Sequence, residues 1–452
     1  MPDETPGEAV SGEAPETIAG GSAPLLWAQI AGNAGLFVGV ALISRALGPE
    51  GRGTVAFITV TAIVSGTVAR FGVTDATTVF CAQRPRVRAV LMTNLLVSVG
   101  VAAVVAAAVV CGTLEFVPRL RPLGIGDPEL AALAMAMVAS GLADAGYMFV
   151  LGCSRFRFHA TVTIVTAWCY AAAIGGVDLA WGLTPLAAAL VWVGSQAVKA
   201  AVLIGASVRA EGLGRFDPRL LRESVSFGLR AWIGTLATAF NERLDQIFVA
   251  LLASEAVLGM YAVAVNAFEI LLYPAGAAAT AILPLAARAA GRDRGGRVLG
   301  AFRSVAMLTV AGIVVAALLG PPLIPLAFGS AFEPSADPFL WLLPGSLGFV
   351  ALAIFSNALV ASSAPGRSSA GPLVSLVLGI VLDVILIPRY GATGAAVAAS
   401  AGLLAGGAVS LALFRRHTPF PARALLVPQR TDVELLRAMA RPFARPRPDS
   451  ST

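Results

Sequence analysis

Charged and amide side chains interrupt the apolar stretch between residues 226 and 252. The interruption consists of Asn241, Glu242, Arg243, Asp245 and Gln246. An arginine with its fork of donors suits a phosphate or another anion, and amides and carboxylates suit a dense field of hydroxyl groups. A carboxylate held away from water can also carry a coupling proton. These residue types therefore predict a polar binding site inside a segment that is otherwise long and apolar enough to cross a membrane.

The spacing of these polar residues predicts that they share one face of a helix. At about 100° per residue, one arc of roughly 140° holds Thr235, Thr238, Asn241, Glu242, Asp245 and Gln246. A charge at mid-bilayer costs from about 3 to well over 10 kcal/mol unless it faces protein or water. The polar face therefore indicates an internal, water-accessible cavity, which the rest of the chain must enclose.

The composition indicates an all-α, polytopic membrane protein. The 452 residues are 57% hydrophobic and 13% charged, with a mean hydropathy of +0.81, and such a chain could hardly cover a soluble surface. Apolar runs near 20 residues predict twelve transmembrane helices. They span 24–45, 54–80, 88–112, 129–151, 158–178, 184–206, 226–252, 256–287, 300–328, 338–361, 369–388 and 391–414. We expect Pro274 and Pro284 to bend the eighth span and Pro344 to bend the tenth.

The arginines predict the orientation. Fourteen arginines lie in one set of alternate loops and five, at positions 45, 52, 119, 121 and 389, in the other set. Because cytoplasmic loops carry the excess of positive charge, both termini are predicted to be cytoplasmic. The acidic segment 1–23 and the basic segment 415–452 are predicted to be cytoplasmic tails, the first of them disordered. The net charge of +6 fits this membrane pattern better than nucleic-acid binding.

A faint internal repeat predicts two six-helix halves around a central cavity. The segment Gly53–Ala56 resembles Gly259–Ala262, and Gly182–Ala188 resembles Gly391–Val397, at nearly equal offsets. Six spans is an even number, so the halves at 24–206 and 226–414 would share one orientation, with a cytoplasmic linker at 207–225. The binding site is expected between the halves, near the bilayer midplane.

A second cationic stripe is predicted in the span 54–80. Thr67, Arg70, Thr74 and Thr78 would lie on one helix face, bordered by Asp75. This arrangement suits a phosphate or sugar contact, although a structural salt bridge from Arg70 to Asp75 or to Asp245 explains the same residues. Lys199 and Arg230 lie nearer the cytoplasmic ends of their spans, where they either extend to the membrane surface or capture substrate.

The intramembrane carboxylates are candidates for ion coupling. They are Asp75, Glu242, Asp245 and Glu269, with Asp144 and Asp383 as weaker candidates. Coupling to a proton gradient, a sodium gradient or the membrane potential stays open. No cofactor or metal is expected, because the four cysteines form no CxxC pair and the P-loop pattern is absent.

Three stretches resemble the polysaccharide-biosynthesis flippases of the O-antigen type, within the multidrug/oligosaccharidyl-lipid/polysaccharide exporter superfamily. They are SRALGPEGRG at 44–53, NERLDQIFVALL at 241–252 with the following LGMYAVAVNAFEILLYPAG, and IPRYGATGAAVA at 387–398. The resemblance covers residues 24 to 415. Arg243 and Asp245 match the family's frequent Arg-x-Asp, and Glu269 stands at a commonly polar position.

The resemblance implies two bundles of six helices, a hydrophilic cavity and alternating access. It also implies that a polyprenyl-pyrophosphate-linked oligosaccharide moves from the inner to the outer leaflet of the plasma membrane. A polysaccharide polymerase and glycosyltransferases would be partners, besides the lipids themselves.

Three alternatives stay open. A multidrug-and-toxin exporter built on the same fold would need an acidic pocket lined by aromatic side chains, but only 7% of the residues of this chain are aromatic. A membrane-bound glycan enzyme would want a sizeable outer loop with paired carboxylates, and the longest outer loop runs from Gly112 to Pro128. A peptidoglycan-precursor flippase would need the same polar cavity and the same membrane helices, and would differ only in its cargo.

Overall fold

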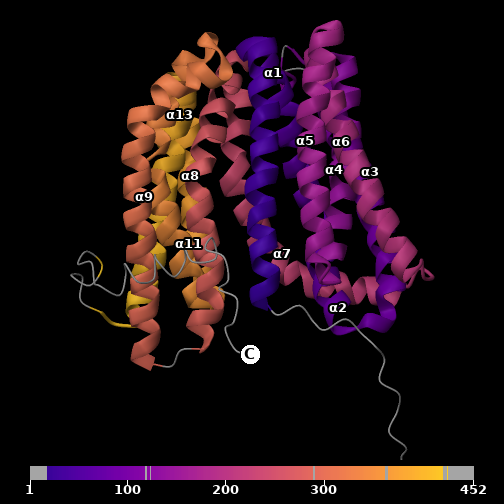
Figure 1. Ribbon diagram of the computed structural model, residues 1–452, viewed down its shortest axis with the longest axis vertical. Helices are drawn as coiled ribbons and strands as arrows, with labels where there is room; N and C mark the ends of the chain where they lie inside the picture. The colour runs from indigo at the N-terminus through magenta and orange to yellow at the C-terminus, as the bar shows by residue number, and fades with distance from the viewer. Residues whose placement is uncertain are drawn as a thin grey trace, which may run out of the picture.

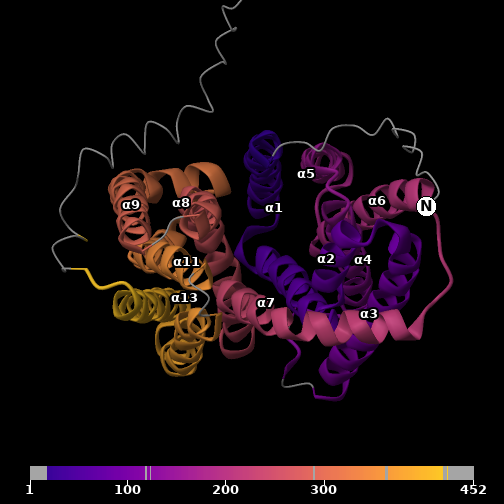
Figure 2. The same ribbon diagram turned by 90° about the horizontal axis from the view of Figure 1, so that it is seen from below.

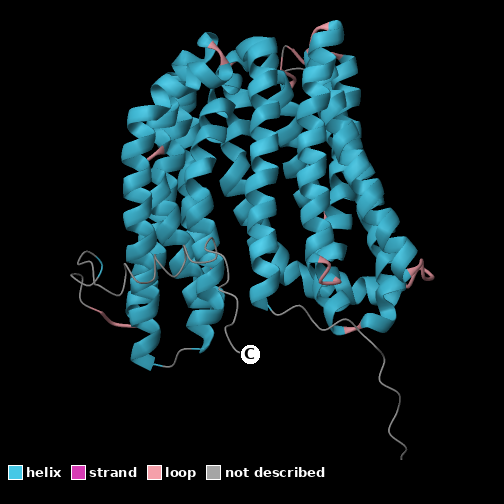
Figure 3. Ribbon diagram, in the orientation of Figure 1, coloured by secondary structure: helices cyan, strands magenta, loops and turns pink. Residues whose placement is uncertain are grey.

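The protein is all-helical, without a strand in the described residues (Figure 3). A computed structural model describes residues 18–117, 120–122, 124–288, 291–361, 365–420 and 425. Its longer helices are α1 (Ile18–Ala69), α3 (Arg88–Phe116), α4 (Asp127–Gly152), α5 (Phe156–Trp181), α6 (Pro185–Glu211), α7 (Pro218–Leu252), α8 (Glu255–Arg288), α9 (Gly291–Phe328), α11 (Gly345–Ala361) and α13 (Ala370–His417). The short elements are α2 (Val73–Gln83), η1 (Pro85–Val87), η3 (Ser330–Ser335), α10 (Ala336–Leu342) and α12 (Pro365–Ser368).

The helices form two bundles with α7 passing between them. In Figure 1 the helices α1 and α3 to α6 stand on one side, and α8, α9, α11 and α13 stand on the other. Seen from below in Figure 2, α7 runs from beneath α3 toward α8 and α13. It accordingly packs against α1, α2 and α3 and also against α8 and α13. The predicted architecture of two helical bundles is confirmed.

The twelve predicted spans are recovered once the breaks in the helices are counted. Among the described residues, eight helices are long and apolar enough to cross a membrane, and a ninth span is the pair 330–342 and 345–360, bent by 46° at Pro344 as expected. The helices α1 and α13 each contain two helical segments, because Gly48 and Gly391 break them with non-helical backbone at positive φ. The twelfth span is α7, whose 35 residues are long enough to cross a membrane and include the charged residues of the predicted polar face.

The predicted span 54–80 is not one helix. Phe71 and Gly72 have φ values of +43° and +72°, so α1 ends at Ala69 and α2 begins at Val73. Left-handed backbone cannot continue a right-handed helix, and glycine is the residue that adopts it without strain. The face shared by Thr67, Arg70, Thr74 and Thr78 was therefore wrongly predicted, since Thr67 belongs to α1, Thr74 and Thr78 belong to α2, and Arg70 lies in the turn between them.

The arginine-rich loops gather at one end of the molecule, which we call the arginine-rich end. Arg84, after α2, forms an ion pair of 2.8 Å with Glu223 of α7. Glu211, at the end of α6, pairs with Arg88 at 3.5 Å and with Arg155 at 3.2 Å. These ion pairs bring together three of the alternate loops on which the predicted orientation rests.

The two bundles meet at the opposite end in a set of close backbone contacts, which we call the glycine seam. It consists of Pro49, Gly53, Glu255 and Gly259. A Cβ atom added to Gly53 would lie 2.0 Å from the carbonyl oxygen of Glu255, and one added to Gly259 would lie 1.9 Å from that of Pro49. Only glycine permits backbones to approach this closely. Beside the seam, Arg45 of α1 donates to the carbonyl oxygens of Ala327, at 2.9 Å, and Leu326, the last turn of α9.

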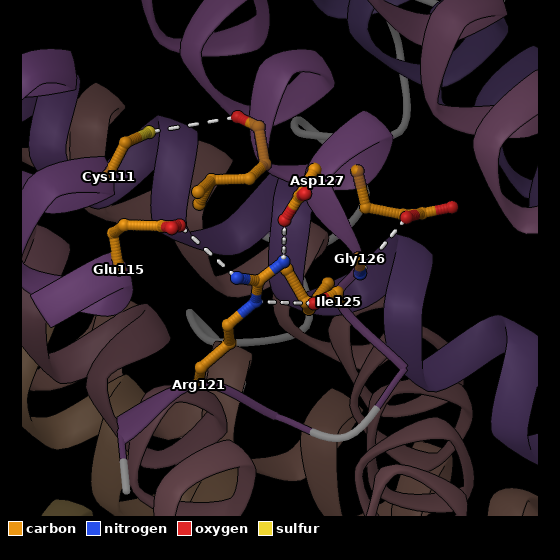
Figure 4. A network of polar contacts seen from close by, with 8 residues as sticks. Cys111, Glu115, Arg121, Ile125, Gly126 and Asp127 are labelled. Carbon is orange, nitrogen blue, oxygen red and sulfur yellow. Dashed lines mark hydrogen bonds and ion pairs between the residues drawn. The ribbon is translucent and has the colours of Figure 1, made fainter. Parts of the chain in front are cut away.

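The loop before α4 is held at this same end by Arg121. Its guanidinium binds Glu115 at 3.2 Å, Asp127 at 2.7 Å and the carbonyl oxygen of Ile125 at 2.6 Å (Figure 4). The Asp127 partner holds the pKa of Arg121 above its ordinary value. Arg121 thus ties the end of α3, through Glu115, to the start of α4, through Asp127.

The predicted tails lie largely outside the described residues. Of the segment 1–23, residues 18–23 are already helical in α1, and of the segment 415–452, residues 415–417 complete α13.

Candidate functional site

Helix α7 is anchored to the first bundle before it reaches the second. Asp217 caps it by accepting from the backbone N–H groups of Arg219 and Leu220, at 2.8 and 3.3 Å. Asn94 of α3 bonds to the backbone of Asp217 in both directions, at 2.9 and 3.0 Å. Farther along, the indole N–H of Trp232 donates to a carbonyl oxygen of α1, that of Thr67, at 3.0 Å. These hydrogen bonds therefore fix the first part of α7 to the first bundle, and the polar residues 241–246 follow this fixed part.

The α7 arginine is paired with a carboxylate of α8. Arg243 Nη1 lies 2.6 Å from Glu269 Oε1, and both side chains are about a quarter exposed, at 25% and 24%. Glu242 beside them is exposed and interacts electrostatically with both. The ion-pair partner of Arg243 is thus Glu269 of α8 rather than Asp245, two residues farther along α7. Charged groups that remain partly accessible inside a span must face water or protein rather than lipid.

Asp245 binds a tyrosine instead. It accepts from the hydroxyl of Tyr261, which is fully buried, and from the backbone N–H of Gln246 at 2.7 Å. One turn earlier, the Asn241 amide donates to the carbonyl oxygens of Ala237, at 2.9 Å, and Pro372 of α13, at 3.0 Å. These bonds dock the polar face of α7 onto the second bundle.

A small cavity of about 30 Å³ lies where α7 meets α13. Its polar lining comes from Asn241, Asp245, Ser375 and Asp383. The Asp383 side chain is 4% exposed, and its Oδ1 atom has no hydrogen-bond partner among the described residues. A cavity of this size holds about one water or one small ion. The cavity thus joins two carboxylates around a space that suits a single proton, water or monovalent cation.

Arg70 belongs to a separate polar group in the first bundle. Its guanidinium lies 3.2 Å from Asp144 of α4 and donates to Thr67 Oγ1 at 2.7 Å. The Asp144 side chain is 42% exposed, and Asp75 is close enough to Arg70 to interact electrostatically. Arg70 does form a salt bridge, but with Asp144, whereas the sequence had suggested Asp75 or Asp245 as its partner.

The other predicted site residues lie apart from these groups. Thr74 is buried in α2 at 1% exposure. Lys199 is half-buried on α6 and interacts electrostatically with His159 of α5. Arg230 lies in α7, and its side chain is not among those described. The structure therefore brings together Asn241, Glu242, Arg243, Asp245 and Glu269, and separately Arg70 with Asp75.

Sequence reasoning missed two residues that complete these groups. Tyr261 stands in the Gly-Met-Tyr-Ala segment, which was noted for the internal repeat and the family resemblance but not as a partner of Asp245. Arg52 is 6% exposed and lies near Arg243 and Tyr170, and its buried Nε has no hydrogen-bond partner within the part of the chain that the structure describes. Its place in a predicted loop, just after the break at Gly48, hid its burial.

The chain resembles known proteins in sequence and in fold. A family model described as polysaccharide biosynthesis protein matches residues 42–337. No curated protein sequence matches the chain at a significant level. One similar solved structure is the lipid II flippase MurJ in an inward closed conformation, with 13% identity, a TM-score of 0.71, and coverage of 94% of this chain and 93% of that chain.

Two further structures are transporters of the MOP superfamily. An inward-facing multidrug resistance MATE family transporter is 12% identical with a TM-score of 0.66, covering 88% of this chain and 98% of that one. A MOP superfamily transporter from Pyrococcus furiosus, whose binding pocket has reverse polarity, is 13% identical with a TM-score of 0.58, covering 88% and 94%. At such identities the likeness is one of fold.

Proposed function

This chain belongs to the polysaccharide biosynthesis protein family, and we propose that it is a flippase for a polyprenyl-pyrophosphate-linked oligosaccharide or a related cell-envelope glycolipid. The cargo moves from the inner to the outer leaflet by alternating access between the two bundles. Its sugar and pyrophosphate pass through the protein while the polyprenyl chain stays in lipid, because neither polar part can cross hydrocarbon unaided.

The observation that carries this proposal is that two arginines of predicted spans each form an ion pair with a partly accessible carboxylate. Arg243 is paired with Glu269, and Arg70 with Asp144. An arginine binds pyrophosphate through two parallel N–H···O bonds, and the phosphate can replace the carboxylate as its partner. The carboxylates thus keep the guanidinium groups neutralised and oriented until cargo arrives, and the released carboxylates then become hydrogen-bond acceptors for sugar hydroxyls.

The small cavity between α7 and α13 supplies the ion coupling in this proposal. Asp245 and Asp383 lie on different helices around one space of about 30 Å³. A cation or proton bound there would hold the two helices together, and its release would let them separate. Because α7 also carries Arg243, occupancy of the cavity would be linked to the position of the phosphate-binding arginine. Glu242, Glu269 and Asp75 remain the other carboxylates for this role.

The proposed setting is the plasma membrane, with both termini and the arginine-rich end in the cytoplasm. The concentration of arginines in alternate loops supports this orientation. A polysaccharide polymerase on the outer side and glycosyltransferases on the inner side are the proposed partners, since they would consume and supply the cargo.

Reconstituted vesicles that carry a fluorescent lipid-linked oligosaccharide test the proposal. We expect Arg243→Ala and Arg70→Ala to abolish flipping while the protein still inserts and stays folded. Arg243→Lys separates two modes of binding, because a point charge survives this change and a two-pronged clamp does not. Arg415→Ala, at the exposed end of α13, is the matched control. Normal flipping by both alanine variants would exclude these arginines from the mechanism.

A peptidoglycan precursor is the second candidate cargo, because the flippase MurJ shares the fold over 94% of this chain. Lipid analysis of a strain that lacks the protein distinguishes the candidates. An accumulated oligosaccharide-lipid supports the first cargo, and accumulated peptidoglycan precursor supports the second. An unchanged lipid profile together with dye sensitivity would instead support a multidrug exporter, the function of the similar MATE family structures.

A further inference from the structure

Two cysteines that are far apart in the sequence meet near the arginine-rich end. Cys81 lies on α2 and is completely buried, and Cys153 follows α4 and is half-buried. A Cβ atom added to Gly152 would lie 3.0 Å from the Cβ of Cys81 and 2.7 Å from the carbonyl oxygen of Thr78. The missing side chain at Gly152 thus lets α2 lie directly against the end of α4, which brings the two thiols into hydrogen-bonding contact.

The surroundings of the pair favour a reactive thiolate. Arg88 donates from Nε to the carbonyl oxygen of Cys81 at 2.9 Å, and Glu211 holds the guanidinium groups of Arg88 and Arg155 beside the pair. The hydrogen bond from Cys81 lowers the pKa of Cys153, and Arg88 and Arg155 act in the same direction, against the opposing effects of burial and of Glu211. The same hydrogen bond raises the pKa of Cys81, as does its burial. Cys153 is therefore the nucleophile of the pair, and it is also the thiol that solvent can reach.

We propose that Cys81 and Cys153 form a peroxide-sensitive dithiol that closes to a disulfide between α2 and α4. The Cys153 thiolate attacks one oxygen of hydrogen peroxide, the O–O bond breaks, and the departing hydroxide takes a proton to leave as water. Cys153 is then a sulfenic acid. The Cys81 sulfur attacks the Cys153 sulfur, the S–O bond breaks, and the hydroxide leaves as a second water with the Cys81 proton. The two thiols lose two electrons, which reduce the peroxide.

Closure of this disulfide constrains the helix that positions α7. On its other side α2 packs against α7, where the rings of Phe80 and Phe227 lie 5.2 Å apart and a Cβ added to Gly228 would lie 2.0 Å from the carbonyl oxygen of Gly72. A disulfide fixes α2 to α4 and so restricts any motion of α7 relative to the first bundle. In a reducing cytoplasm the thiols stay free, and oxidative stress closes the bond. This regulatory consequence rests on the proposed flippase function, whereas formation of the disulfide does not.

Peptide mass spectrometry of the full chain in nanodiscs tests the modification itself. After treatment with hydrogen peroxide we expect a cross-linked peptide pair that contains Cys81 and Cys153 and that dithiothreitol separates. Cys81→Ser and Cys153→Ser should each abolish it, and the double variant Cys111→Ser/Cys169→Ser should retain it. Cys169 lies inside the span α5, away from this pair, so its replacement should leave the cross-link unchanged. Sulfinic acid at Cys153 with no cross-link to Cys81 after the same treatment would overturn the proposal.

Transport by the same vesicles tests the regulation separately. We expect peroxide to slow flipping by the wild type, dithiothreitol to restore it, and Cys153→Ser to flip at the same rate with or without peroxide. A cross-link that forms without slowing transport overturns the regulatory role and leaves the modification site in place. A chain that forms the cross-link but never transports the glycolipid, even when reduced, contradicts the proposed function instead.

Discussion

The glycine seam permits a direct test of alternating access, because a single methyl group should prevent it from closing. A Cβ on Gly259 would lie 1.9 Å from the carbonyl oxygen of Pro49, whereas real Cβ contacts stay beyond 3.0 Å. The Gly259→Ala variant must therefore move the two bundles apart by about 1 Å at this point, or strain the backbone. Overpacking of this kind costs about 1–3 kcal/mol, which changes a two-state equilibrium about 5- to 150-fold. This free-energy cost applies only to the conformation in which the seam is closed. The fraction of molecules in the conformation that is open at this end should therefore increase.

Thiol labelling in a cysteine-free background measures this shift. Thr54 is 3% exposed beside Glu255 of the seam, so Thr54→Cys should react slowly with a membrane-impermeant maleimide while the seam is closed. We expect Gly259→Ala, and equally Gly53→Ala, to accelerate labelling about 5- to 150-fold without global unfolding. The control is Gly205→Ala on α6, where an added Cβ meets only open space. If the seam variants label at the rate of this control and melt at the same temperature, the seam does not close as described and the reasoning is refuted.

Three further outcomes follow from the ion pairs and the small cavity. Arg243→Ala and Glu269→Gln should each destabilise the protein by about 1–3 kcal/mol. This is less than the cost of breaking a fully buried ion pair, because a quarter of each side chain is accessible. A double-mutant cycle in chemical unfolding should show coupling between the two substitutions, and strictly additive effects would contradict the ion pair. Asp383→Asn should abolish the dependence of flipping on the ion gradient while leaving cargo binding intact, measured in vesicles with and without an imposed gradient; unchanged dependence would exclude the cavity. Arg84 holds the pKa of Glu223 below its ordinary value. The ion pair therefore stabilises the protein at pH values above the ordinary glutamate pKa of about 4.3, and this stabilisation is lost as the pH falls through the lowered pKa. The Glu223→Gln variant should accordingly melt at a slightly lower temperature than the wild type at neutral pH and at the same temperature in acid.

The architecture could be predicted because the membrane imposes it. Apolar runs of sufficient length must be helices in a bilayer, and the prediction of twelve such runs needed little beyond composition and arginine placement. The polar face of α7 followed from helical periodicity for the same reason. These features depend on local sequence, so a single chain is sufficient to find them.

The pairings could not be predicted, because they depend on which helices become neighbours. Arg243 and Glu269 are 26 residues apart, on antiparallel neighbours, and Arg70 and Asp144 are 74 apart. Nothing in composition ranks Asp144 above Asp75 as a partner for Arg70. The break at Phe71 was hidden for another reason. A glycine inside an apolar run is common in membrane helices, and only the backbone conformation distinguishes a tolerated glycine from a helix end.

The internal repeat has a physical meaning that the sequence alone did not supply. The repeated segments that begin at Gly53 and Gly259 meet in space, since a Cβ on Gly259 would lie 3.0 Å from the backbone nitrogen of Gly53. When two halves of the same orientation are related by an axis along the membrane normal, equivalent residues near the axis contact each other. The other repeated pair agrees to the extent that Gly182 and Gly391 both have positive φ, at +74° and +56°. A glycine is thus required twice at the seam, once in each half, because each half makes the same close approach to the other.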